Sequence, residues 1–192
     1  NYMGQRLILT FGALFVSVVF CFAQKNDLNS SIRRADSFVG EGQYEQALEL
    51  LDSIENECLE SEDNGVFISF LFNKGVVLQL CGKDETSIPF FEKICMRYKE
   101  LGVKNDIYIA SLSSIGGAYF RMGNYATSED YFRKTVICCY SEIVSEEVAC
   151  EYLSQAYPFL YAIYKELDND VLQEECLYKL EEIDRWKKTK TK

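Results

Sequence analysis

A turn signature recurs at a fixed place in a pattern of paired helices, and it constrains the fold more than any other feature of this chain. The copies are Gly42-Gln43-Tyr44, a weaker Gly82-Lys83-Asp84, and Gly123-Asn124-Tyr125. Seven places before each glycine stands a small residue: Ala35, Gly75 and Gly116. Nine places after it stands an apolar residue: Leu51, Phe91 and Phe132. Repetition at a fixed period indicates a repeat architecture, in which units must stack to bury their apolar faces.

The repeated positions describe a hairpin of two helices. A small residue in the first helix lets the second helix approach closely, and glycine ends the first helix because a left-handed conformation suits it there. The second helix again carries a small residue at the crossing point, followed by an apolar stripe. The sequence therefore predicts helices over residues 28–40, 44–58, 66–81, 86–99, 106–122, 126–141, 145–167 and 171–186.

At these residues the chain resembles the tetratricopeptide repeat (TPR) family. That family's pattern runs from a small residue to an aromatic three places on, then Gly-x-Tyr across the turn and alanine in the second helix. The first and third copies match it well, and the second has Asp84 where the tyrosine belongs. A fourth, degenerate copy keeps Leu160, Tyr164 and Leu177, but Asp168-Asn169-Asp170 replaces Gly-x-Tyr.

The resemblance implies an all-α, helical-hairpin repeat solenoid of about four repeats, near residues 28–58, 68–98, 109–140 and 154–184. Equivalent positions lie 40, 41 and 45 residues apart, whereas the family's repeat has about 34. We therefore expect longer second helices or longer loops between repeats.

The N-terminus carries a second signal. Residues 7–23 are almost uninterrupted apolar sequence, preceded by Arg6 and followed by a polar stretch. This pattern predicts a secretory signal peptide over residues 1–23, cleaved after Ala23, which would place the repeat domain 24–192 in the periplasm or at the cell surface. Two alternatives remain open: a retained membrane anchor, because this length lies at the bottom of the spanning range, and a lipoprotein modified at Cys21. The Phe-Ala-Gln ending resembles exported proteins of Bacteroidetes-type bacteria.

Charge and residue inventory narrow the function. The chain has a net charge of −10 and no histidine, and the predicted leader removes one basic residue, which leaves −11. This acidity argues against nucleic acid as a partner and against anionic membranes, so membrane contact is expected only if the leader is retained. Without histidine the Ser-His-Asp, Cys-His and HExxH chemistries are excluded. We therefore expect no enzyme, no metal and no small-molecule cofactor, and a frayed basic tail over residues 185–192.

Seven of the eight cysteines follow the predicted leader. An odd number leaves at least one unpaired within a monomer. A bridge between Cys58 and Cys95 is conceivable, since both fall near the ends of neighbouring second helices. The alternative is that the cysteines are small buried apolar side chains.

In the TPR family the first helices line a concave groove, and the resemblance implies which residues would face it here. They are Ile32, Asp36, Phe72, Val76, Leu80, Phe120 and Arg121. Family members that clamp a C-terminal carboxylate present lysine, arginine and asparagine at such places, which this chain lacks apart from Asn73. The predicted function is a non-catalytic protein–protein interaction scaffold that binds an unknown peptide or protein through apolar anchors. The alternatives are that these residues pack against the next repeat, or that the chain is a membrane-tethered extracytoplasmic sensor fragment of a signalling system.

Overall fold

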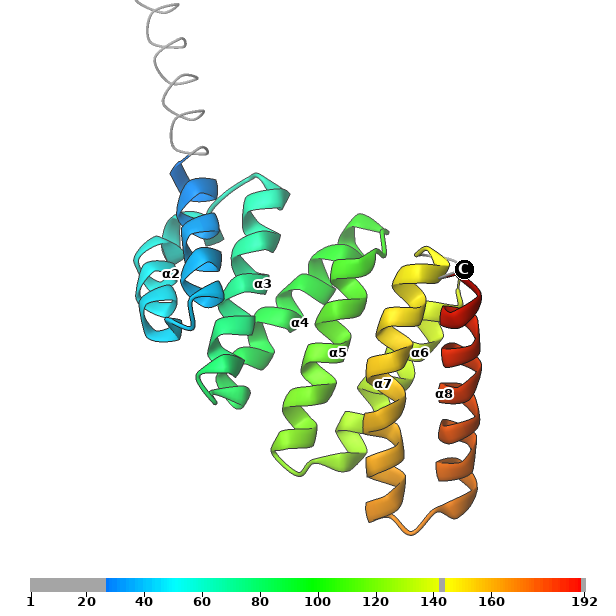
Figure 1. The fold of residues 1–192 in the computed structure, drawn as a ribbon. Coiled ribbons are helices and arrows are strands. Elements are labelled where there is room, and N and C mark those ends of the chain that lie inside the picture. The colour runs from blue at the N-terminus through cyan, green and yellow to red at the C-terminus, as the bar shows by residue number, and fades with distance from the viewer. Residues whose placement is uncertain (1–26, 142–143, 191–192) are drawn as a thin grey trace, which may run out of the picture. The chain divides into compact units, whose positions relative to one another are not determined.

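The computed structural model describes residues 27–141 and 144–190, and all regular structure in those ranges is helical (Figure 1). Residues 27–40 form the first helical segment. The helices that follow are α2 (Tyr44–Leu59), α3 (Asn64–Leu80), α4 (Asp84–Leu101), α5 (Asp106–Arg121), α6 (Tyr125–Tyr140), α7 (Glu146–Glu166) and α8 (Asp170–Lys190). The predicted leader lies outside the described residues.

The chain divides into two compact units, residues 1–77 and 78–192, at a boundary inside α3. In the first unit the apolar core includes Leu28, Ile32, Ala35, Ala47, Leu51, Cys58, Val66, Ile68, Phe70, Leu71 and Val77. Lys74 of α3 is also buried there, and its ammonium group pairs with the carboxylates of Asp52 and Glu55 of α2. A buried cation is tolerated because it is paired.

In the second unit each helix packs against its neighbour in the chain, and α5 also contacts α7. Figure 1 shows this succession from α4 in green to α8 in red. The core of this unit runs through the aromatic residues of α6 and α7, where the rings of Phe132 and Phe159 stack with centroids 4.7 Å apart.

Four turns between paired helices share one backbone geometry. Gly42, Gly82 and Gly123 have φ values of 74°, 71° and 76°, and Asp168 takes the same left-handed conformation at 51°. In each turn the following N–H group donates to a carbonyl five residues back, as in Gln43 to Phe38 (2.8 Å) and Asn169 to Tyr164 (2.9 Å), which closes the helix end. The fourth turn therefore has the geometry of the others despite its different sequence.

In the third hairpin the small residues lie where the paired helices nearly touch. Gly116 of α5 is buried against the ring of Phe132 of α6, so that a methyl group at Gly116 would approach that ring to 3.2 Å. The hydroxyl of Ser128 in α6 donates a hydrogen bond of 2.8 Å to the carbonyl oxygen of Gly116. This contact confirms the predicted crossing point of the third hairpin.

Several local expectations were wrong. α4 begins at Asp84 and not at residue 86, so Pro89 lies in its second turn. In the fourth repeat both helices are long, because α7 and α8 have 21 residues each, and α7 runs unbroken through Pro158. Leu177 is 48% exposed, and Cys176 beside it occupies the core position of α8.

The basic tail is not frayed over its described length. α8 continues as a helix to Lys190. The ammonium group of Lys187 donates to the hydroxyl of Ser154 in α7 at 2.7 Å. Lys190 lies 3.6 Å from a carboxylate oxygen of Glu146 and 5.4 Å from the centroid of the Trp186 ring. These cations at the C-terminal end of α8 are favoured by the helix dipole.

Candidate protein-interaction surfaces

The predicted groove residues of the first unit differ in exposure. Ile32 is only 4% exposed, so its side chain belongs to the core of the unit and does not present a surface. Asp36, on the same helical segment, is exposed. Phe72 and Val76 of α3 are half-buried and lie one turn apart on the helix. Of these four residues, Asp36, Phe72 and Val76 leave part of their side chains open to a partner.

In the second unit, Leu80 ends α3 with 44% of its surface exposed. Phe120 of α5 is half-buried, and its ring makes an edge contact with Phe159 of α7 at 5.1 Å. Much of the Phe120 ring is therefore used in packing against the next repeat, which was the alternative to a role in binding. Arg121 is exposed, and its guanidinium binds both carboxylate oxygens of Asp84, with the shortest contact at 2.6 Å. Asp84 stands where the family has tyrosine, and here it holds Arg121 in place.

The described cysteines are free thiols, and burial suppresses the reactivity of several of them. All seven described cysteines are unpaired, including Cys58 and Cys95. Burial raises the pKa of Cys95 and of Cys139 to about 12, with the nearby Glu92 adding to the effect at Cys95. Burial likewise raises the pKa of Cys58 to about 11. Thiols with such pKa values are protonated near neutral pH and are poor nucleophiles.

A polar network ties α6 to α7. The hydroxyl of Tyr164 donates to Glu129 at 3.0 Å, and Arg133 donates to the same carboxylate oxygen at 2.7 Å. Burial raises the pKa of Tyr164 to about 12, and the neighbouring Glu129 carboxylate adds to the effect. This network fixes the position of Arg133 at the surface of α6.

Within residues 27–141 and 144–190, no three His, Cys, Asp or Glu side chains are placed to hold a metal ion. In the same ranges no helix has both the length and the hydropathy needed to span a bilayer.

A hollow in the second unit lies at the turn from α4 to α5, with a volume of about 830 Å³. Lys99 and Lys104 lie at its edge, and the rings of Tyr98 and Tyr108 make an edge contact with centroids 6.4 Å apart. The amide of Asn105 donates to the hydroxyl of Tyr98 at 2.9 Å. The hollow is open and mixes cationic and aromatic groups.

No motif in the sequence pointed to a second surface, the groove between α6 and α8. Two hollows lie in it, of about 200 and 390 Å³. Ile137 of α6, which borders the first, is 67% exposed, and Tyr178 of α8 is 54% exposed. The sequence offered one indication of this surface, because Ile137 and Tyr178 both fall outside the apolar stripes that the repeat pattern requires.

No protein-family model matches this chain, and no curated protein matches it. Among solved structures, it is similar to the nearly identical TPR-like repeats assigned to a kinesin light chain of Podosopora anserina. In one crystal structure the match has 16% identity and a TM-score of 0.52, and it covers 82% of this chain and 94% of that one. A second crystal structure, of a single-residue variant of those repeats, has 15% identity, a TM-score of 0.53 and coverage of 86% and 97%.

These similarities show the fold. The chain is an all-α protein of helical hairpins with the TPR-like repeat architecture, and the predicted fold class is confirmed. Repeats of this kind present extended surfaces built from successive hairpins.

Proposed function

We propose that this protein is a non-catalytic scaffold for protein–protein interactions, exported to the periplasm or the cell surface. The observation that supports this proposal best is the TPR-like fold itself, because stacked helical hairpins offer long surfaces for protein segments. The absence of histidine from the sequence removes the most common acid–base chemistry and agrees with a binding role.

The proposed binding surface lies on the first helices of the hairpins. In the first unit Phe72 and Val76 are half-buried and offer apolar surface. Asp36, which the repeat pattern also assigns to the groove, is exposed and offers a carboxylate. In the second unit Leu80 is an exposed apolar anchor, and Arg121 is a cation oriented by Asp84. Surfaces with apolar anchors and a few fixed polar groups typically bind amphipathic or extended peptides. The partner is therefore proposed to be a peptide or protein segment bound through apolar side chains.

Export is proposed from the leader pattern of residues 1–23. A short apolar core after one basic residue, ending in alanine before a polar stretch, fits a cleaved signal peptide.

Site-specific photo-crosslinking tests the binding surface. A photoreactive phenylalanine analogue replaces Leu80 in one variant and Leu177 in a control, since the two side chains are 44% and 48% exposed. After irradiation of cells that express the protein natively, mass spectrometry identifies the adducts. A partner that forms adducts at position 80 and not at 177, and that binds Leu80→Ser at least about tenfold more weakly, supports the proposal. The same adducts at both positions, or none at position 80, would overturn the first-helix surface as the binding site.

A further inference from the structure

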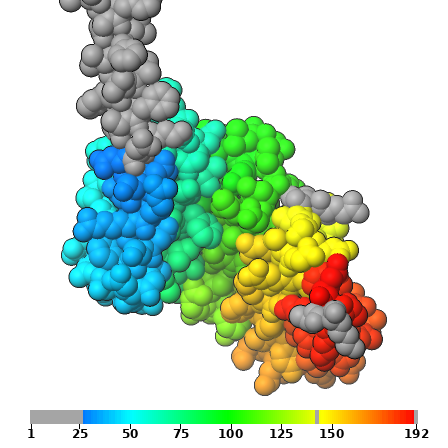
Figure 2. Space-filling model, turned by 45° about the horizontal axis from the view of Figure 1, so that its top comes forward, coloured from blue at the N-terminus to red at the C-terminus, as the bar shows by residue number. Residues whose placement is uncertain are grey.

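The second helices of the last two hairpins leave a groove between them. α7 packs against both α6 and α8, whereas α6 and α8 share no backbone contact, although both are fully described. We call the gap above α7, bounded by these two helices, the α6–α8 groove. Figure 2 shows α7, in yellow to orange, beside the red α8 on the surface of the molecule.

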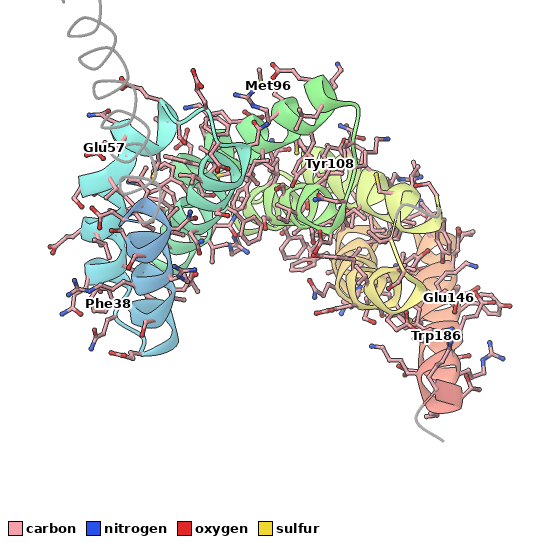
Figure 3. All side chains as sticks on the ribbon, turned by 90° about the horizontal axis from the view of Figure 1, so that it is seen from above. Phe38, Glu57, Met96, Tyr108, Glu146 and Trp186 are labelled. Atoms are coloured by element: carbon pink, nitrogen blue, oxygen red, sulfur yellow. The ribbon has the colours of Figure 1, made fainter. Side chains whose placement is uncertain are left out.

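The floor of the α6–α8 groove is apolar and contains two hollows. The first, of about 200 Å³, includes Val136, Leu160, Leu172 and Cys176 among its lining residues. The second, of about 390 Å³, includes Val144, Leu153, Ile183 and Trp186. Glu146 and Trp186, which both line the second hollow, are labelled close together in Figure 3. The first is smaller than the range of about 300–1,000 Å³ usual for small-molecule sites and the second is near its lower limit, so both suit single side chains.

Exposed apolar side chains extend this floor onto the rims. Ile137 and Tyr140 of α6 are 67% and 57% exposed, and Val171 and Tyr178 of α8 are 76% and 54% exposed. On α8, residues 171 and 178 fall on the same side of the helix as Glu175 and Glu182, which line the two hollows. Several exposed apolar side chains beside apolar hollows are typical of an interaction site.

The spacing of the hollows sets the shape of the occupant. Cys176 lines the first hollow and Ile183 the second, and the two are seven residues apart on α8. Seven residues of α-helix span about 10.5 Å, or two turns. A helix that lies along the groove would place apolar side chains at positions i and i+7 into the two hollows.

The charges on the rim set the chemistry of the occupant. Glu175 lines the first hollow, and Glu146 and Glu182 line the second. Hydrogen bonds from Lys179 and Tyr178 lower the pKa of Glu182, which keeps its carboxylate ionised.

The cations near the groove are already engaged. Arg133, which lines the first hollow, pairs with Glu129 at 2.7 Å, and Lys179 pairs with Glu182 at 2.8 Å. Lys190 pairs with Glu146 at 3.6 Å, which leaves Glu175 as the rim carboxylate without an ion pair among the described residues. In a chain of net charge −10, the groove therefore favours a basic partner.

We propose that the α6–α8 groove docks a basic amphipathic helix of a partner protein. Two apolar side chains, seven residues apart on that helix, fill the two hollows, and its lysine or arginine side chains lie beside Glu175. This inference rests on the proposed role as an interaction scaffold, but it uses the second helices and not the first-helix surface.

Designed peptides test the spacing and the charge. The first probe is a capped helical peptide of about eighteen alanine, glutamine and lysine residues with two leucines seven residues apart. A second probe has the same composition with the leucines five residues apart, which turns one leucine about 140° away from the other. A third replaces every lysine with glutamate. Fluorescence anisotropy with the purified full chain is expected to show at least about tenfold tighter binding of the first probe than of the other two.

Matched variants test the location. Ile137→Ser and Tyr178→Ser are each expected to weaken binding of the first probe about tenfold, since each removes a rim contact. Leu177→Ser is the control for Tyr178→Ser, because it is adjacent in α8, 48% exposed and on the other side of the helix. Glu175→Gln should weaken binding and its neighbour Glu174→Gln should not. Circular dichroism confirms that each variant is folded.

Three results would overturn the proposal. The first is equal affinity for the two leucine spacings or for the lysine and glutamate probes, and the second is no binding of any probe at millimolar concentration. The third is a dimer in sedimentation analysis that Ile137→Ser dissociates, which would make a second copy of the chain the occupant. The crosslinking variant at Leu80 is independent of all these residues, so failure of this groove is distinguishable from failure of the first-helix surface.

Discussion

Gly116 and Gly117 are adjacent in α5 and both buried, yet an alanine substitution is expected to leave the protein less stable at Gly116 than at Gly117. At Gly116 an added methyl carbon would lie 3.2 to 3.3 Å from three carbons of the Phe132 ring. At Gly117 the only close atom is a terminal guanidinium nitrogen of Arg121, at 3.3 Å. The Arg121 side chain is exposed, so even paired with Asp84 it can yield by a few tenths of an ångström more easily than a buried ring can.

The magnitudes follow from two competing effects. Alanine in a helix interior is about 1 kcal/mol more favourable than glycine. Overpacking a filled core costs about 1–3 kcal/mol. Phe132 is fully buried and its ring stacks on Phe159 at 4.7 Å, so it cannot retreat without moving α7. We therefore expect Gly116→Ala to range from neutral to about 2 kcal/mol destabilising, and Gly117→Ala to stabilise by up to about 1 kcal/mol.

Urea denaturation of both variants, followed by circular dichroism, measures the difference in the free energy of unfolding. Gly116→Ala should be about 1–3 kcal/mol less stable than Gly117→Ala. Gly116→Leu should be less stable still, because the larger side chain adds volume at the same contact. If Gly116→Ala were as stable as Gly117→Ala, the close approach of α5 and α6 at this glycine would be refuted.

Further predictions concern processing, a buried charge and alkaline pH. Intact-mass measurement of native envelope material should find a chain that starts at Gln24, and residues 3–23 still attached would mean a retained anchor. The double variant Asp52→Ala with Glu55→Ala removes both carboxylates that pair with the buried ammonium group of Lys74, and it should lower the free energy of unfolding by about 3–5 kcal/mol in urea denaturation. Lys74→Met should lower it less, because that variant removes the buried charge itself. Equal losses in the two variants would contradict this. Burial raises the pKa of Cys139 to about 12, above the usual value of about 8.5, so the folded state keeps a proton that the unfolded state releases. The contribution of Cys139 to stability should therefore be constant up to about pH 8 and fall as pH rises toward 12. A urea midpoint that is unchanged between pH 8 and 10 would contradict this.

The turn signature predicted the fold because it records backbone geometry directly. A left-handed residue is needed at each hairpin turn, and glycine supplies it at low cost, so three turns were visible as glycines. The fourth was recognised only by its spacing, since Asp168 reaches the same conformation at 51° and Asn169 caps α8 by accepting from the N–H group of Leu172 at 3.2 Å. Asp and Asn tolerate this conformation better than other residues.

Side-chain exposure was harder to predict than the helices. Spacing alone places Ile32 on the first helix, but not whether that face is covered, and the structure buries it. The family pattern also placed Leu177 in the core of α8, where Cys176 is found one residue earlier. If α8 turns about its own axis by one residue, about 100°, Cys176 and Leu177 exchange the core position. The degenerate fourth copy has neither the tyrosine nor the alanine that would fix this rotation. The tail was misjudged for a related reason, because the contacts of Lys187 with α7 depend on tertiary packing.

The α6–α8 groove follows from the same repeat geometry that buries the core. The first helices of the last two hairpins, α5 and α7, contact each other, whereas their second helices do not. The apolar stripe that holds α8 against α7 accounts for Cys176 and Ile183, but it does not require Ile137 or Tyr178, whose exposure contributes little to stability. Exposed apolar residues grouped around such a groove are better explained by a partner than by the fold. A scaffold with one surface on its first helices and another on its second helices would hold two segments at once, and linked segments bind such a pair more tightly than either segment alone.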